Sequence, residues 1–196
     1  MKRLVAATKN PGKLKEVVEI LADMPYEIVS LAAYPDAPDV EETGTTFVEN
    51  AILKAREYSR FTGEMTVADD SGLEIDALDG APGVHSSRFA PTDAERIARV
   101  LDLMKDVPDE KRTARFRCAI AIAWPDKRVE TCEAKVEGTI AHEPRGDKGF
   151  GYDPIFQVTE LGRMMAELES EEKNAVSHRG RALRSAKKLL LEEEAH

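Results

Sequence analysis

Val67-Ala68-Asp69-Asp70-Ser71-Gly72-Leu73 is the stretch around which the chain is organised. An apolar run ends there in two carboxylates, a hydroxyl and a glycine, the order expected where a buried strand emerges and the chain turns. Acidic side chains at such a strand exit can hold a divalent cation and still reach a substrate. Taken alone, the stretch is more commonly a turn whose Asp side chains cap backbone groups. The surrounding segments must therefore decide between chemistry and a capped turn.

Composition describes a soluble globular protein. The chain has 196 residues, of which 42% are hydrophobic and 33% charged, enough for one large domain or two lobes that share a sheet. No run reaches the roughly 18 consecutive apolar residues of a membrane span, and no signal-peptide cleavage pattern follows the first residues. We therefore expect a cytoplasmic protein that does not bind membranes.

Net charge and the spacing of Cys and His argue against two further classes of protein, nucleic-acid-binding proteins and zinc proteins. The net charge of −9 argues against a broad nucleic-acid-binding face, which requires clustered Lys and Arg. A metal ion and a few well-placed basic residues can still bind a small polyanion. Cys118 and Cys132 have no metal-ligand spacing, and none of the four histidines is paired at zinc spacing. A structural zinc is not expected.

The segment Thr8-Lys9-Asn10-Pro11-Gly12-Lys13 follows a short apolar strand. Asn10 is a good N-cap and Pro11 suits the first position of the helix that the apolar spacing after it predicts. Free N–H groups at that helix start, together with Lys13, could bind an anion. Plain helix capping would use the same residues, and the Gly-x4-Gly-Lys-Ser/Thr spacing of the P-loop is absent. Both interpretations stay open.

Glu41 and Glu42 form an acidic turn before a second helix, which Thr46 and Glu49 open with capping-box spacing. Such glutamates are most commonly solvated surface charges. They could also add a second carboxylate to a cation held by Asp70, provided that the turn folds beside it. Sequence spacing does not distinguish these two roles.

The second half of the chain predicts a hairpin and a glycine-rich loop. Residues 113–124 alternate bulky side chains with alanines, and residues 128–136 pair with them through a Pro-Asp-Lys turn. The glycines of Gly149-Phe150-Gly151-Tyr152-Asp153-Pro154 let a backbone approach a ligand, and the two aromatic rings could stack on a base or simply pack locally. Ser177 can cap a C-terminal helix. Without a repeat or linker, we expect residues 1–196 to form one domain.

Four clusters, taken together, carry a resemblance. They are Thr8-x-Asn10-x-x-Lys13, residues 68–73, residues 149–154 and Glu172-Lys173-Asn174-x-x-Ser177-His178-Arg179. In this order and spacing the sequence closely resembles the inosine triphosphate pyrophosphatase family, from about residue 3 to about residue 190, and it matches the pattern at every motif position.

The resemblance implies an α/β fold with a long mixed central sheet, flanking helices and two lobes around a substrate cleft. It also implies a Mg²⁺-dependent hydrolase, typically a homodimer, that converts ITP, dITP and XTP to the monophosphate and pyrophosphate. Glu41 and Asp70 would bind the metal, and Asp70 would be the general base. The implied substrate-binding residues are Thr8, Lys9, Asn10, Pro11, Gly12, Lys13, Ser71, Phe150, Gly151, Tyr152, Asp153, Lys173, His178 and Arg179.

The chemistry suits these residue types. Hydrolysis at the α-phosphorus spreads negative charge that Mg²⁺ and Lys13 can offset, while Asp70 activates water. His178 or Arg179 would donate a hydrogen bond to the 6-carbonyl of hypoxanthine or xanthine and leave adenine mispaired. Two alternatives remain: a pyrophosphatase for modified pyrimidine or standard nucleotides, and a non-catalytic nucleotide sensor, which would not need Asp70 beside a metal.

Overall fold

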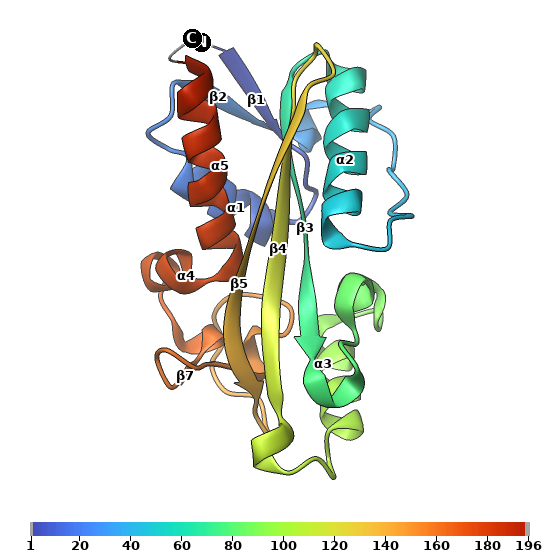
Figure 1. The fold of residues 1–196 in the computed structure, drawn as a ribbon, viewed down its shortest axis with the longest axis vertical. Coiled ribbons are helices and arrows are strands. Elements are labelled where there is room, and N and C mark those ends of the chain that lie inside the picture. The colour runs from blue at the N-terminus through green and yellow to red at the C-terminus, as the bar shows by residue number, and fades with distance from the viewer. Residues whose placement is uncertain (1, 195–196) are drawn as a thin grey trace. The chain divides into compact units, whose positions relative to one another are not determined.

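The computed structural model describes residues 2–194, which form a seven-stranded sheet with flanking helices (Figure 1). The strand order is β2-β1-β3-β4-β5-β6-β7. The strands are β1 (Lys2–Ala6), β2 (Tyr26–Ser30), β3 (Met65–Ile75), β4 (Thr113–Ala123), β5 (Val129–Ile140), β6 (Phe156–Val158) and β7 (Arg163–Met164). The α-helices are α1 (Pro11–Ile20), α2 (Phe47–Thr62), α3 (Asp93–Leu103), α4 (Ser170–Val176) and α5 (His178–Glu194).

Strand direction makes the sheet mixed. β1 pairs in parallel with β2 and β3, so that Leu4 lies opposite both Ile28 and Met65. At the other edge, β6 runs antiparallel to β5 and β7. The predicted α/β fold with a mixed central sheet and flanking helices is confirmed.

The chain divides into two compact units. Unit 1 comprises Met1–Asp70, Cys118–Ala134 and Arg179–His196, and unit 2 comprises Ser71–Arg117 and Lys135–His178. Unit boundaries fall inside β3, β4 and β5. The assignment of residues 1–196 to one domain stays a prediction, and each unit is described by itself.

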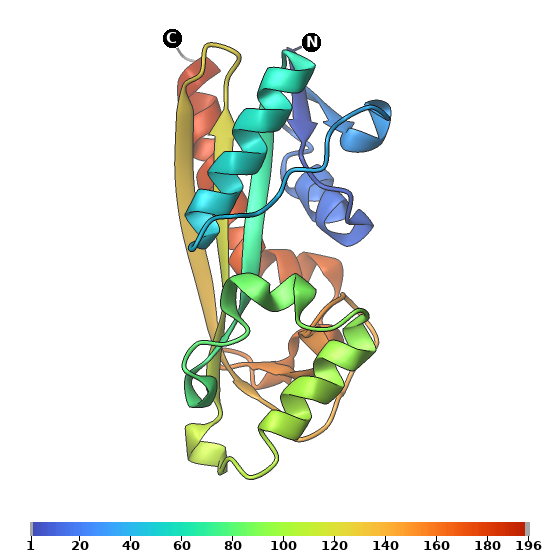
Figure 2. The same ribbon diagram turned by 90° about the vertical axis from the view of Figure 1, so that its right-hand side faces the viewer.

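The core of unit 1 follows the alternation in β4. Cys118, Ile120 and Ile122 point to one face and pack with apolar residues of α1 and α5, among them Val17 and Leu183. The intervening alanines of β4 are also fully buried, and alternation places them on the opposite face. Figures 1 and 2 show α5 and α2 on opposite faces of these strands. Small side chains therefore face α2, where they permit close packing.

Helix starts in unit 1 follow the predicted caps. The Asn10 side chain accepts hydrogen bonds from the N–H groups of Gly12 and Lys13, which open α1. Thr46 and Glu49 form the predicted capping box at the start of α2. In unit 2, α3 opens with a capping box of the same kind. Each box satisfies N–H groups that a helix start leaves without intrahelical partners.

The core of unit 2 gathers apolar residues from β3 to β6 and from α3, with Phe116, Val100 and Phe156 among its buried members. β5 extends to Ile140, past its predicted end at residue 136. The short strands β6 and β7 and the seven-residue helix α4 have no counterpart among the sequence predictions. Among residues 2–194, no helix has the length and apolar character to cross a membrane.

Gly138 in β5 makes the closest backbone approach in the unit 2 sheet. A Cβ atom there would lie 2.4 Å from the Gln157 carbonyl oxygen and 2.4 Å from the Phe156 ring. Because Phe156 is fully buried and cannot move aside cheaply, we expect Gly138→Ala to destabilise the protein by roughly 1 to 3 kcal/mol. Denaturant unfolding measures the change, with Thr131→Ala on the exposed side of β5 as the control. Equal stability of the two variants would contradict this packing argument.

Candidate active site

Lys13 and Asp69 meet in unit 1. The Lys13 Nζ lies 2.9 Å from Asp69 Oδ2, which joins the start of α1 to the strand β3. The lysine-bearing turn and the aspartate pair therefore lie together. The contacting carboxylate is Asp69, not the neighbouring Asp70.

Asp69 also belongs to a buried network of alternating charge. The Arg179 Nε donates to Asp69 Oδ2 at 3.2 Å, and its Nη1 donates to Glu16 Oε2 at 2.7 Å. Glu16 lies on α1, three residues after Lys13, and sequence reasoning missed it. Burial alone would raise the pKa of Asp69, but the charges of Lys13 and Arg179 outweigh it and hold that pKa far below its usual value.

Asp70 has the opposite electrostatic environment. Burial raises its pKa to about 6, and the nearby charge of Glu42 adds to the rise. Lys54 Nζ lies 3.9 Å from Asp70 Oδ1, and the Asn50 amide donates to Asp70 Oδ2 at 3.1 Å. Both contacts favour the charged form without cancelling the effect of burial. A carboxylate with a raised pKa in such surroundings is typical of a functional site.

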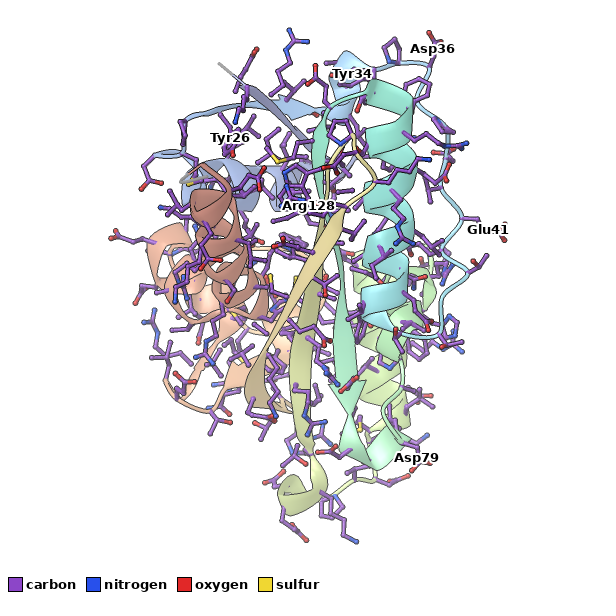
Figure 3. The ribbon with its side chains drawn as sticks, turned by 45° about the horizontal axis from the view of Figure 1, so that its top comes forward. Tyr26, Tyr34, Asp36, Glu41, Asp79 and Arg128 are labelled. Carbon is purple, nitrogen blue, oxygen red and sulfur yellow. The ribbon has the colours of Figure 1, made fainter. Side chains whose placement is uncertain are left out.

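Glu42, and not Glu41, turns toward Asp70. The Glu42 carboxylate lies 2.6 Å from Lys54 Nζ, and its charge acts on Asp70. Glu41 is exposed, and Figure 3 shows its side chain pointing away from the ribbon. Metal binding by Glu41 stays a prediction, and the geometry adds Glu42 as a second candidate.

The fit of a divalent cation can be tested on these groups. Among residues 2–194, no cluster of three or more His, Cys, Asp or Glu side chains has the arrangement of a metal site. Mg²⁺ does not need such a cage, because it is commonly held by one or two carboxylates together with substrate phosphates and water. Asp70 with Glu42 supplies two carboxylates, and burial raises the pKa of Asp70 even though the nearby positive charges of Lys54 and Lys13 lower it. These residues fit Mg²⁺.

The start of α1 differs from the predicted anion site in one respect. Asn10 Oδ1 accepts from the N–H groups of Gly12 and Lys13, and Thr8 Oγ1 accepts from the N–H of Asn10. The prediction that the helix start offers free N–H groups is therefore wrong for these three donors. Lys13 Nζ remains as the cation of this loop, while Lys9 pairs with the exposed Asp39 at 2.5 Å.

The glycine-rich loop in unit 2 is held by Asp153. Its Oδ2 accepts from the N–H of Phe150 at 3.1 Å and lies 2.8 Å from Lys173 Nζ. The same Nζ lies 4.4 Å from the centre of the Phe150 ring. Gly149 has a φ of 73°, and a Cβ atom there would lie 2.1 Å from Asp153 Oδ2. Glycine is therefore required both by the backbone and by the close carboxylate.

Further contacts in unit 2 fix the loop and His178. The Tyr152 hydroxyl donates to the Ser86 carbonyl at 2.7 Å, and the N–H of Gly151 donates to Asp93 Oδ2 at 2.8 Å. The His178 ring stacks on Phe116 with centres 4.7 Å apart. Sequence reasoning missed these positioning partners, because each contact joins segments far apart in the chain.

The predicted site residues are divided into two groups by the unit in which they lie. Unit 1 contains Thr8, Lys9, Asn10, Pro11, Gly12, Lys13, Glu41, Asp70 and Arg179, and unit 2 contains Ser71, Phe150, Gly151, Tyr152, Asp153, Lys173 and His178. The individual roles assigned to these residues stay predictions. The geometry adds Glu16, Glu42, Asn50, Lys54 and Asp69 to the first group.

Comparison with known proteins decides the family. The Ham1 family model matches residues 4–189. The chain belongs to the Ham1 family. It is 51% identical over 191 residues to a dITP/XTP pyrophosphatase of Desulforamulus reducens, covering 96% of this chain and 95% of that protein. It is also 51% identical over 193 residues to a dITP/XTP pyrophosphatase of Bacillus subtilis, covering 97% and 98%.

Solved structures agree with this membership. A HAM1 protein from Coxiella burnetii superposes with a TM-score of 0.89 at 48% identity, covering 98% of this chain and all of that one. The Staphylococcus aureus Ham1 protein gives a TM-score of 0.85 at 39% identity, with the same coverage. The family predicted from the sequence is confirmed. The Ham1 model matches residues 4–189, close to the predicted extent of about 3 to 190, and the relatives are named dITP/XTP pyrophosphatases.

The raised pKa of Asp70 makes a prediction about stability in buffer without divalent metal ions. Its folded-state value of about 6 lies above the ordinary 3.8, so ionisation of Asp70 increasingly destabilises the folded state as the pH rises from 3.8 to 6, and the penalty is complete above pH 6. We expect Asp70→Asn to raise the free energy of unfolding at pH 7.5 by up to roughly 3 kcal/mol, with little gain near pH 4. Denaturant unfolding at both pH values measures this, with exposed Asp102→Asn as the control. A gain independent of pH would contradict the assignment.

Proposed function

We propose that this Ham1-family protein hydrolyses non-canonical purine nucleoside triphosphates, namely dITP, XTP and ITP, to the monophosphate and pyrophosphate. The observation that carries the proposal is the Asp70 carboxylate, buried with a pKa of about 6 beside Lys54 and Glu42. Relatives about half identical over nearly the whole chain are named dITP/XTP pyrophosphatases. A nucleotide sensor has no use for such a carboxylate, so an enzyme is the better interpretation.

Asp70 is proposed as the general base. Water attacks the α-phosphorus and the bond to the oxygen of the leaving pyrophosphate breaks. The proton lost by the water passes to the Asp70 carboxylate, which is ionised at neutral pH because its pKa is about 6. A base with a pKa close to the working pH combines the correct protonation state with useful basicity. Asn50, whose amide donates to Asp70 Oδ2, would fix the orientation of that carboxylate.

Cationic groups of unit 1 would stabilise the phosphates. We propose that Asp70 holds Mg²⁺ together with a glutamate of the acidic turn, either Glu41 or Glu42. When bound, Mg²⁺ would offset the negative charge that develops on the phosphate oxygens. Lys13 and Lys54 add two positive charges, and the pKa of Lys54 stays above its usual value because three carboxylates outweigh its burial. A loosely bonded phosphoryl transition state depends mainly on such positioning and charge.

Unit 2 would contact the nucleoside. Phe150 is the proposed stacking surface, because the Tyr152 ring is buried and its hydroxyl is already bonded to Ser86. His178, stacked on Phe116, is the proposed donor to the 6-carbonyl of hypoxanthine or xanthine. Adenine presents an amino group there, and a mispaired buried polar group costs roughly 1 to 3 kcal/mol. The homodimer, the cytoplasmic location and the absence of nucleic-acid and membrane partners stay predictions.

A nucleotide panel tests the proposed reaction. With Mg²⁺ present, we expect pyrophosphate release from dITP, XTP and ITP at specificity constants at least roughly 100-fold above those for dATP and dCTP, since several mispaired groups act together. Asp70→Asn should retain nucleotide binding and lose turnover by roughly 100-fold or more. Surface Asp102→Asn should behave as wild type. Preference for a pyrimidine or a standard purine triphosphate would replace the proposed substrate class, and binding without turnover would indicate a sensor.

Metal removal tests the cation site independently of turnover. We expect chelation by EDTA to abolish pyrophosphate release and added Mg²⁺ to restore it. Mg²⁺ should also raise the melting temperature of the wild type, because a ligand that binds only the folded state stabilises it. Asp70→Asn should lose that shift. An undiminished shift in this variant would move the cation away from Asp70.

A further inference from the structure

Four side chains of unit 1 form a chain of alternating charge, in the order Lys13, Asp69, Arg179 and Glu16. Lys13 and Glu16 lie three residues apart on α1, Asp69 lies on β3, and Arg179 is the second residue of α5 (labelled in Figure 1). The contacts are Lys13–Asp69 at 2.9 Å, Arg179–Asp69 at 3.2 Å and Arg179–Glu16 at 2.7 Å. Two positive and two negative side chains thus balance one another.

Three of these four charged side chains are almost completely buried. The side chains of Glu16 and Asp69 are each 8% exposed and that of Arg179 is 3% exposed, whereas Lys13 is 20% exposed. Charges taken out of water are tolerated only when their partners are well placed. Lys13 is the most exposed of the four, so it is the member best able to meet a ligand from solution. The other three hold one another and Lys13.

Both Arg179 and Lys13 contact the same oxygen, Oδ2 of Asp69. A guanidinium can grip a carboxylate with two parallel N–H bonds. Here, Arg179 Nε donates to Asp69 and Nη1 donates to Glu16, so the guanidinium bridges the two carboxylates. Without the charge of Glu16, the guanidinium would shift on Asp69 and compete with Lys13 for it.

We propose that Glu16 is a positioning residue for Lys13, acting through Arg179 and Asp69, in the binding of the triphosphate. The inference rests on the proposed function, in which Lys13 binds phosphate. Glu16 itself is too deeply placed to contact the ligand, and it carries the wrong charge for a phosphate. Its effect on the ligand is therefore transmitted through the two side chains between it and Lys13.

The sign of the effect separates this proposal from simple electrostatics. Removing a negative charge near a polyanion site should strengthen anion binding if charge alone matters. If Glu16 instead keeps Lys13 in place, Glu16→Gln should weaken binding. Glu19→Gln is the matched control, because Glu19 lies on the same helix, is exposed and pairs with Lys15.

Titration calorimetry with pyrophosphate measures the binding without turnover. We expect Glu16→Gln to weaken pyrophosphate binding roughly tenfold, a coupling usual for side chains in one charge network, and Glu19→Gln to leave it unchanged. KM for dITP should rise by a similar factor, with a smaller change in kcat. In a Lys13→Ala background, Glu16→Gln should have no further effect on pyrophosphate binding, because Glu16 acts on the ligand only through the Lys13 side chain, which this background lacks.

Several outcomes would overturn the proposal. One is that Glu16→Gln binds pyrophosphate as tightly as the wild type or more tightly. Another is that Glu16→Gln weakens pyrophosphate binding by the same factor in the Lys13→Ala background as in the wild type. If Glu16→Gln does not fold, Arg179→Lys serves the same comparison, since a lysine keeps the charge but cannot bridge two carboxylates as a guanidinium does. Wild-type affinity in a folded Arg179→Lys protein would also overturn it. A wild-type protein that binds pyrophosphate but has no nucleotide turnover would refute the proposed reaction and leave this test intact.

Discussion

The buried carboxylate of Asp69 is the constraint on which unit 1 depends. It must remain ionised away from water, and it does so chiefly because Lys13 and Arg179 reach it from α1 and α5, with a further contribution from the charge of Lys54. Arg179 lies 110 residues away along the chain, so the strand and both helices must reach their final positions before the charge is compensated. Such a buried network adds little net stability, since desolvation offsets much of the attraction. Its effect is to fix one arrangement of side chains at the helix start.

Two adjacent aspartates in β3 have opposite electrostatic environments for a simple geometric reason. Successive side chains of a strand point to opposite faces, so Asp69 meets Lys13 and Arg179 while Asp70 meets Asn50 and Lys54. One pKa is held low and the other is raised to about 6. Neighbouring acids whose pKa values are driven apart can divide structural and chemical roles. Asp69 contacts two of the cations, and Asp70 keeps the raised pKa on which its proposed role as general base depends.

Sequence reasoning succeeded for helix caps, but the strand exit and turn expected at residues 69–72 are wrong, because β3 continues through them to Ile75. Asn10 and the Thr46–Glu49 box determined helix starts because a cap and its N–H partners lie within a few residues. It failed for β6 and β7, since strands of three and two residues are too short to show alternation. It also missed Glu16 and Asn50, because each side chain acquires its role from a partner far along the chain. From the sequence alone, Glu16 would be taken for a solvent-exposed carboxylate, and only the folded structure shows its contact with Arg179.

Within each unit, the proposed site residues are held by a different kind of contact. In unit 1, Lys13, the proposed phosphate-binding lysine, is held by charge through its ion pair with the buried Asp69. In unit 2 the glycine-rich loop is held by direct hydrogen bonds, from Phe150 and Lys173 to Asp153 and from Gly151 to Asp93. Pre-ordered groups spare a ligand the entropic cost of arranging them. Because the contacts named in the two units share no side chain, separate substitutions can test the proposed phosphate contacts and the proposed base contacts.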